Sequence, residues 1–80
     1  MKLIEAISLR IKELMQERNI TQYRLGKVCN IPHTTLSNIF CSICKSVNMD
    51  IIVKICKGLG ISLKEFFRGE VFELQNLEVD

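Results

Sequence analysis

The stretch TQYRLGKVCNIPHTTLSNIFC, residues 21–41, decides how this chain folds. Apolar residues recur at helical spacing in its first half, in its second half and just beyond it: Leu25, Val28 and Cys29, then Leu36, Ile39, Phe40 and Ile43. Between the two runs, Asn30 tolerates the left-handed backbone conformation that ends a helix, and Pro32 cannot continue one. The stretch therefore predicts two short helices joined by a tight turn, each with one buried face.

The second of these helices leaves a polar face opposite its apolar one: His33, Thr34, Ser37, Asn38 and Cys41. Four of these five side chains form hydrogen bonds readily, and none is charged at neutral pH unless His33 is protonated. Short hydrogen-bonding side chains in front of a buried apolar face suit the edges of DNA bases. The pattern therefore indicates a helix that reads DNA in the major groove.

The same stretch resembles the helix-turn-helix of the lambda-repressor/Cro-type (XRE) family of small DNA-binding regulators. The resemblance is carried by Thr21-Gln22, Leu25, Asn30-Ile31-Pro32, Thr34-Thr35-Leu36-Ser37-Asn38-Ile39 and, downstream, residues 54–67. It extends over about residues 3–72, nearly the whole chain. It implies an all-α fold, a compact five-helix lambda-repressor-like DNA-binding domain over residues 1–69, with the motif at about 21–41. A short acidic C-terminal tail over 70–80 follows.

Two groups of DNA contacts are expected. The base-reading group lies on the helix at about residues 33–41: His33, Thr34, Ser37 and Asn38. Asn38 is the best single candidate, because an amide can pair with adenine through two hydrogen bonds. The group that holds the DNA backbone is Thr21, Gln22, Tyr23, Thr35, Lys45 and Asn48. Thr21 is a predicted N-cap, the resemblance implies the contact at Gln22, and Tyr23 could equally cover the edge of the core.

Two longer helices flank the motif. The first covers residues 3–18 and stops at Arg18-Asn19, and its apolar stripe is Ile4, Ile7, Ile11, Leu14 and Met15. The other is capped by Asn48, ends at Gly60 and buries Ile52, Ile55, Cys56 and Leu59. Both are expected to form scaffold, because neither can bury its stripe alone.

The C-terminal part is shorter and less regular. Ser62 and Glu65 form a capping box that starts a fifth helix, which should turn Leu63, Phe66 and Phe67 inward and end at Gly69. The spacing of apolar residues in the tail allows either a short strand or a helical turn. Phe72 and Leu74 could fold back on the core or contribute to a dimer contact.

The chain departs from the family pattern around the end of the motif. Relatives often pair an acidic residue at the position of Phe40 with an arginine at the position of Met15, and both are apolar here. An apolar pair can stabilise a core as well as a buried ion pair. Relatives also tend to have Gly, a base and Pro where this chain has Ser42, Ile43 and Val47. Lys45 is the base that remains in this loop.

Four cysteines allow a zinc site or a redox function, and Cys41-x-x-Cys44 has the spacing of a ligand pair. Cys29 and Cys56, however, fall on apolar helix faces, where a free cysteine acts as a small hydrophobic residue. There is no second C-x-x-C in the sequence. Structural packing is therefore the favoured interpretation, and no metal or cofactor is expected.

Charge and composition narrow the function classes. Residues 1–69 hold all eleven basic and five of the nine acidic side chains, a net charge of +6, whereas residues 70–80 hold four acids and no base. No apolar run approaches the length of a membrane span, and charged residues interrupt the N-terminal segment where a signal peptide would be apolar. The expectation is a cytoplasmic protein with no membrane contact and no small-molecule substrate.

The sequence therefore predicts a sequence-specific DNA-binding transcriptional regulator that binds double-stranded DNA, as a homodimer on a palindromic site. The alternative is a protein-interaction module, antitoxin-like or an accessory factor, which keeps the fold without the DNA function. An enzyme is not expected. The single histidine lacks a neighbouring nucleophile or carboxylate in the predicted geometry, and no Gly-rich phosphate loop is present.

Overall fold

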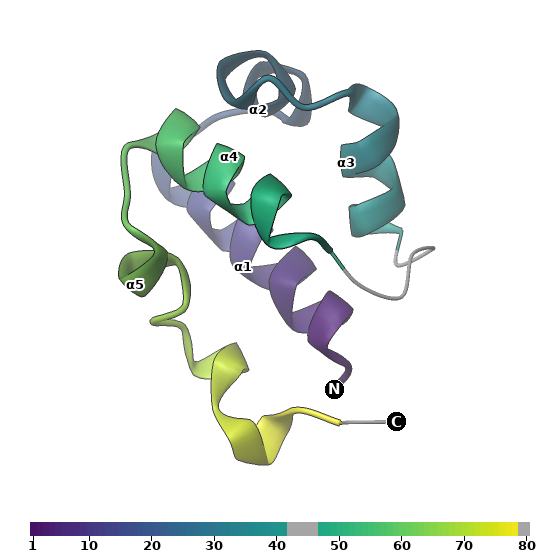
Figure 1. The fold of residues 1–80 in the computed structure, drawn as a ribbon, viewed down its shortest axis with the longest axis vertical. Coiled ribbons are helices and arrows are strands. Elements are labelled where there is room, and N and C mark those ends of the chain that lie inside the picture. The colour runs from purple at the N-terminus through teal and green to yellow at the C-terminus, as the bar shows by residue number, and fades with distance from the viewer. Residues whose placement is uncertain (42–46, 79–80) are drawn as a thin grey trace.

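The computed structural model describes residues 1–41 and 47–78. Its elements are α1 (Leu3–Arg18), α2 (Gln22–Cys29), α3 (His33–Phe40), α4 (Met49–Leu59), α5 (Leu63–Phe66) and the 3₁₀ helices η1 (Glu70–Phe72) and η2 (Leu74–Asn76). In Figure 1, α1 runs behind α4, with α2 above them, α3 to the right, α5 to the left and the tail below. The Cα radius of gyration is 11.9 Å, as compact as expected for this length. The predicted all-α, five-helix fold is confirmed.

Helix ends are set by local sequence. Three residues with positive φ, the left-handed conformation, end α1, α2 and α4: Asn19, Asn30 and Gly60. At the other ends, the hydroxyl oxygen of Thr21 accepts a hydrogen bond from the backbone N–H of Arg24 at 3.2 Å. The hydroxyl oxygen of Ser62 accepts a hydrogen bond from the backbone N–H of Glu65 at 3.1 Å. These single-residue devices explain why the predicted bounds of the first helices are correct.

One hydrophobic core joins the helices. It contains Ile4, Ile7, Ile11, Leu14, Leu25, Cys29, Ile31, Leu36, Ile39, Ile52, Ile55, Cys56 and Phe66. Met15 and Phe40, the apolar pair at the end of the motif, pack against this core. The ammonium group of Lys12 lies 5.6 Å from the centre of the Phe40 ring, a cation–π distance. Among residues 1–41 and 47–78, no helix combines the length and the apolar character needed to cross a membrane.

The contact between α2 and α4 is closest at Gly58. A Cβ atom at this position would lie 2.3 Å from Sγ of Cys29 and 3.0 Å from Cα of Cys29, so a larger residue would force the helices apart. The prediction that Val28 is buried is wrong, because Val28 is 43% exposed. Leu25 and Cys29 fill the contact with the core, and Val28 lies at its edge beside Gly58 and Leu59 of α4.

A buried arginine, which the apolar pattern did not reveal, ties α1 to α5. Arg10 is only 5% exposed. Its Nε and Nη2 donate hydrogen bonds to the carbonyl oxygens of Phe66 and Glu65, both at 2.7 Å. Its Nη1 pairs with the carboxylate of Glu13. The two carbonyl groups lie at the end of α5, where the regular bonds of the helix stop, so Arg10 provides them with donors across the interface between α1 and α5.

The fifth helix is shorter than predicted. It ends at Phe66 instead of near Gly69. The prediction that Leu63 faces inward is also wrong, because Leu63 is 40% exposed. A single helical turn buries only Phe66. The carbonyl groups at its end accept hydrogen bonds from the side chain of Arg10, and that of Glu65 also accepts one from the backbone N–H of Arg68 at 3.3 Å.

The tail folds as two 3₁₀ turns, so of the two alternatives for its local structure the helical turn is confirmed and the strand is wrong. Phe72 folds back on the core, with its ring centre 4.9 Å from that of Phe67 and 6.0 Å from that of Phe66. Leu74 is 85% exposed. The backbone N–H of Glu78 donates to the carbonyl oxygen of Met1 at 2.7 Å. The tail therefore contacts both the core and the N-terminus.

Candidate nucleic-acid interface

The polar surface of the motif is built from the N-terminal ends of α2 and α3. Pro32 occupies the N-cap position of α3 and brings no capping oxygen, so N–H groups of the first turn are left for water or a phosphate. Asn48 is the N-cap residue of α4 by position, as predicted, but its side chain makes no capping hydrogen bond. The predicted side-chain cap at Asn48 is therefore wrong.

A hydrogen-bonded cluster joins these two helix ends. Nε2 of Gln22, in the first turn of α2, lies 3.2 Å from Oγ of Ser37 and 3.3 Å from Nε2 of His33, both on α3. The ring Nδ1 of His33 lies 3.5 Å from the same serine oxygen. The three contacts fit together when His33 is neutral with its proton on Nδ1. Gln22 thus fixes the orientation of two side chains that were predicted to read bases.

The remaining candidates on α3 divide as the helical pattern predicts. Thr34 and Asn38 are exposed, Thr35 is half-buried, and Leu36 and Ile39 beneath them are buried. The polar face therefore stands above a packed apolar one, so the helix can present it without loss of core contacts. Lys45 and Cys44 lie outside the described residues.

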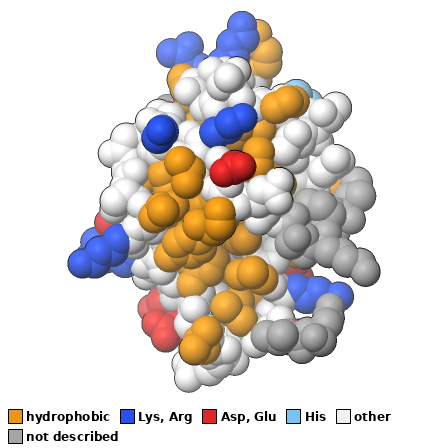
Figure 2. Space-filling view, viewed as in Figure 1, with side chains coloured by type: hydrophobic (Ala, Val, Ile, Leu, Met, Phe, Trp, Pro, Cys, Tyr) orange, Lys and Arg blue, Asp and Glu red, His pale blue; other side chains and the backbone are white. Residues whose placement is uncertain are grey.

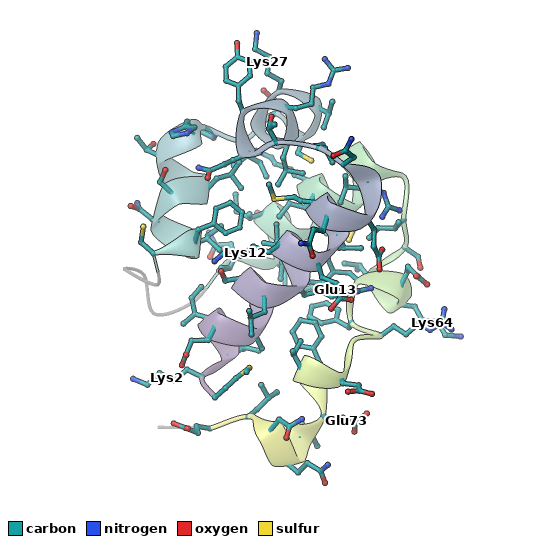
Figure 3. The ribbon with its side chains drawn as sticks, turned by 180° about the vertical axis from the view of Figure 1, so that it is seen from behind. Lys2, Lys12, Glu13, Lys27, Lys64 and Glu73 are labelled. Atoms are coloured by element: carbon teal, nitrogen blue, oxygen red, sulfur yellow. The ribbon has the colours of Figure 1, made fainter. Side chains whose placement is uncertain are left out.

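The charge around this surface favours a polyanion. Residues 18–49, which include the whole motif, contain no Asp or Glu. Arg24 and Lys27 lie on the exposed side of α2, and Figure 3 shows Lys27 projecting beyond α2 at the end of the molecule where α2 and α3 meet. A positive surface beside a polar helix face is the electrostatic footprint of a nucleic-acid-binding domain.

A comparison with protein-family models agrees with this geometry. The model of the Cro/C1-type HTH DNA-binding domain matches residues 10–70. The chain belongs to this Cro/C1-type helix-turn-helix family. The match spans α2 to α5 and most of α1, so the predicted family resemblance is confirmed. Searches of curated proteins and of solved structures found no match.

The Cro/C1-type domain is a DNA-binding domain of transcription regulators, and the helix-turn-helix of this chain is α2, the turn at Asn30 and α3. Two features of its surface were missed by sequence reasoning. One is the contact of Gln22 with His33 and Ser37, which no spacing rule reveals because the partners lie on different helices. The other is Lys27, whose position four residues after Tyr23 was the signal that could have found it.

The cysteines of this Cro/C1-type domain are consistent with packing. Cys29 and Cys56 are buried, and burial raises the pKa of both thiols above the ordinary value of 9.0, with the neighbouring Cys56 adding to the rise at Cys29. Sγ of Cys29 also lies 3.7 Å from the carbonyl oxygen of Ile55. Among the described residues, no three His, Cys, Asp or Glu side chains come together as a metal site.

Thiol labelling tests this assignment. At pH 8 we expect iodoacetamide to alkylate the exposed Cys41 at least about tenfold faster than Cys29 or Cys56, since the thiolate is the reactive form. Folding raises the pKa of the two buried thiols, so the folded protein keeps their protons to a higher pH than the unfolded chain does. Their contribution to the free energy of unfolding is therefore present below pH 9 and is lost as the pH rises above 9. Peptide mass spectrometry of the folded and urea-unfolded protein measures the rates. Equal labelling of all thiols in the folded protein would contradict the packing assignment.

Proposed function

We propose that this domain is a sequence-specific transcriptional regulator in which α3 lies in the major groove of double-stranded DNA. The observation that carries the proposal is the cluster of Gln22, His33 and Ser37, because it fixes polar side chains before DNA arrives. Side chains that are already oriented lose less conformational entropy on binding.

The side chains divide into two roles. His33, Thr34, Ser37 and Asn38 meet base edges, and Thr21, Gln22, Tyr23, Thr35, Lys45 and Asn48 hold the backbone of the DNA. Gln22 takes part in both: its amide N–H groups contact His33 and Ser37, and the backbone N–H groups at this helix N-terminus are left for a phosphate. We infer no catalytic role for any of them.

A single reading helix of eight residues covers few base pairs, so useful specificity requires two copies. We infer that the domain binds as a homodimer to a palindromic site, with the two copies of α3 about one helical turn of DNA apart. We infer that the protein acts in the cytoplasm, on the DNA that its domain binds.

In vitro selection from a library of random duplexes tests the proposal. We expect the protein to enrich one motif whose two halves are related by inversion, with half-site centres about 10 base pairs apart. The affinity should fall steeply with salt. Enrichment of no motif, or of a single unrepeated half-site, would contradict the dimeric reader.

A second candidate is the protein-interaction module. Figure 2 shows a broad apolar area over α4 and below it. Several apolar side chains that pack against the core are only partly buried, among them Val47, Ile51, Ile61, Phe67 and Phe72. A large apolar area on a monomer often marks an interface. This candidate predicts no shift of bulk duplex DNA in electrophoresis at low salt, whereas the regulator predicts a shift that added salt removes.

A further inference from the structure

A small hollow lies on the motif surface beside the reading helix. Its volume is about 150 Å³, and it is lined by residues from α2, from the turn and from the start of α3: Gln22, Tyr23, Gly26, Lys27, Ile31 and His33. Gly26 and Ile31 contribute little polarity, while His33 and Gln22 belong to the hydrogen-bonded cluster. The hollow therefore borders the proposed base-reading side chains directly.

Lys27 and Tyr23 form the opposite side of this hollow. The ammonium nitrogen of Lys27 lies 5.2 Å from the centre of the Tyr23 ring, and the ring is 64% exposed. In the described part of the chain, no carboxylate lies within ion-pair distance of Lys27. A cation that rests on an aromatic face keeps N–H donors available for an anion.

We propose that Lys27 and this hollow bind one phosphodiester group of the DNA backbone, at the flank of the bases that α3 reads. The ammonium group of Lys27 pairs with the phosphate, the hydroxyl of Tyr23 donates to it, and the adjoining sugar lies against the apolar hollow. A lysine serves as a point charge for phosphate and carries no sequence information. The contact therefore fixes the register of α3 on the duplex, and it rests on the proposed DNA-binding function.

The salt dependence of binding tests the site. For Lys27→Met we expect the slope of log affinity against log salt to become shallower by about 0.9, the value for one neutralised phosphate. Between 50 and 200 mM salt, the wild type should thus lose about threefold more affinity than the variant. The preferred sequence should not change. Lys64→Met is the matched control, because Lys64 is an exposed lysine on α5, away from α2 in Figure 3, and its slope should equal that of the wild type.

Duplexes with a single neutral methylphosphonate locate the contact. One position should weaken the wild type and have no further effect on Lys27→Met, because both changes remove the same ion pair. Tyr23→Phe should weaken binding at that position and Tyr23→Leu more. An unchanged slope for Lys27→Met, or equal methylphosphonate effects on both proteins at every position, would overturn the site while DNA binding stands. A wild type that binds no duplex would overturn the proposed function as well. Circular dichroism controls for folding.

Discussion

Replacing Arg10 by methionine is expected to lower the free energy of unfolding by about 3 kcal/mol, from two charge-assisted hydrogen bonds at about 1.5 kcal/mol each. The methionine can fill the space of the aliphatic stem, so the loss reports the guanidinium group. Without it, the carbonyl oxygens of Glu65 and Phe66 each lose a charge-assisted hydrogen bond of 2.7 Å at the interface between α5 and α1. Urea unfolding followed by circular dichroism measures the change.

Arg68→Met is the matched control. Arg68 pairs with the carboxylate of Glu65 at 3.3 Å, but its side chain is 75% exposed, against 6% for Arg10. An exposed ion pair contributes less than about 1 kcal/mol. Arg10→Lys should fall between wild type and Arg10→Met, since an ammonium group can reach fewer carbonyl oxygens than the planar guanidinium. Equal losses for Arg10→Met and Arg68→Met would show that Arg10 does not hold α5 to α1.

The contrast between α1 and α5 shows what the sequence could predict about the fold. The end of α1 was predictable because Asn19 acts on its own backbone, as do Asn30 and Gly60. The end of α5 was not, because the side chain that satisfies its last carbonyl groups, Arg10, lies more than fifty residues earlier. A contact between such distant residues leaves no periodic signal in the sequence.

In the candidate interface too, the sequence could predict features within one helix but not contacts between helices. The polar face of α3 was predictable from spacing, since Leu36 and Ile39 are buried and Asn38 is exposed. Spacing along one helix could not show that Gln22 reaches His33 on another helix. The prediction that Leu63 faces inward is wrong for a related reason. The spacing of apolar residues defines a buried helix face only over more than one turn, and α5 is a single turn.

Asn38→Ala is expected to cost about 1–3 kcal/mol of binding free energy on the selected duplex, and far less on a random one, because it removes a base contact. Asn38 is exposed and off the buried face of α3, so the fold should change little. His33→Ala should also reduce the preference, since His33 belongs to the cluster with Gln22.

The most direct test of the claim that α3 reads sequence is the ratio of two affinities. The wild type and Asn38→Ala are titrated against the selected duplex and a shuffled one at a single salt concentration, with circular dichroism to confirm that both are folded. If α3 reads sequence, the wild-type preference for the selected duplex falls about fivefold or more in Asn38→Ala, equivalent to at least about 1 kcal/mol. An unchanged ratio, whether both affinities fall together or neither falls, would contradict the claim.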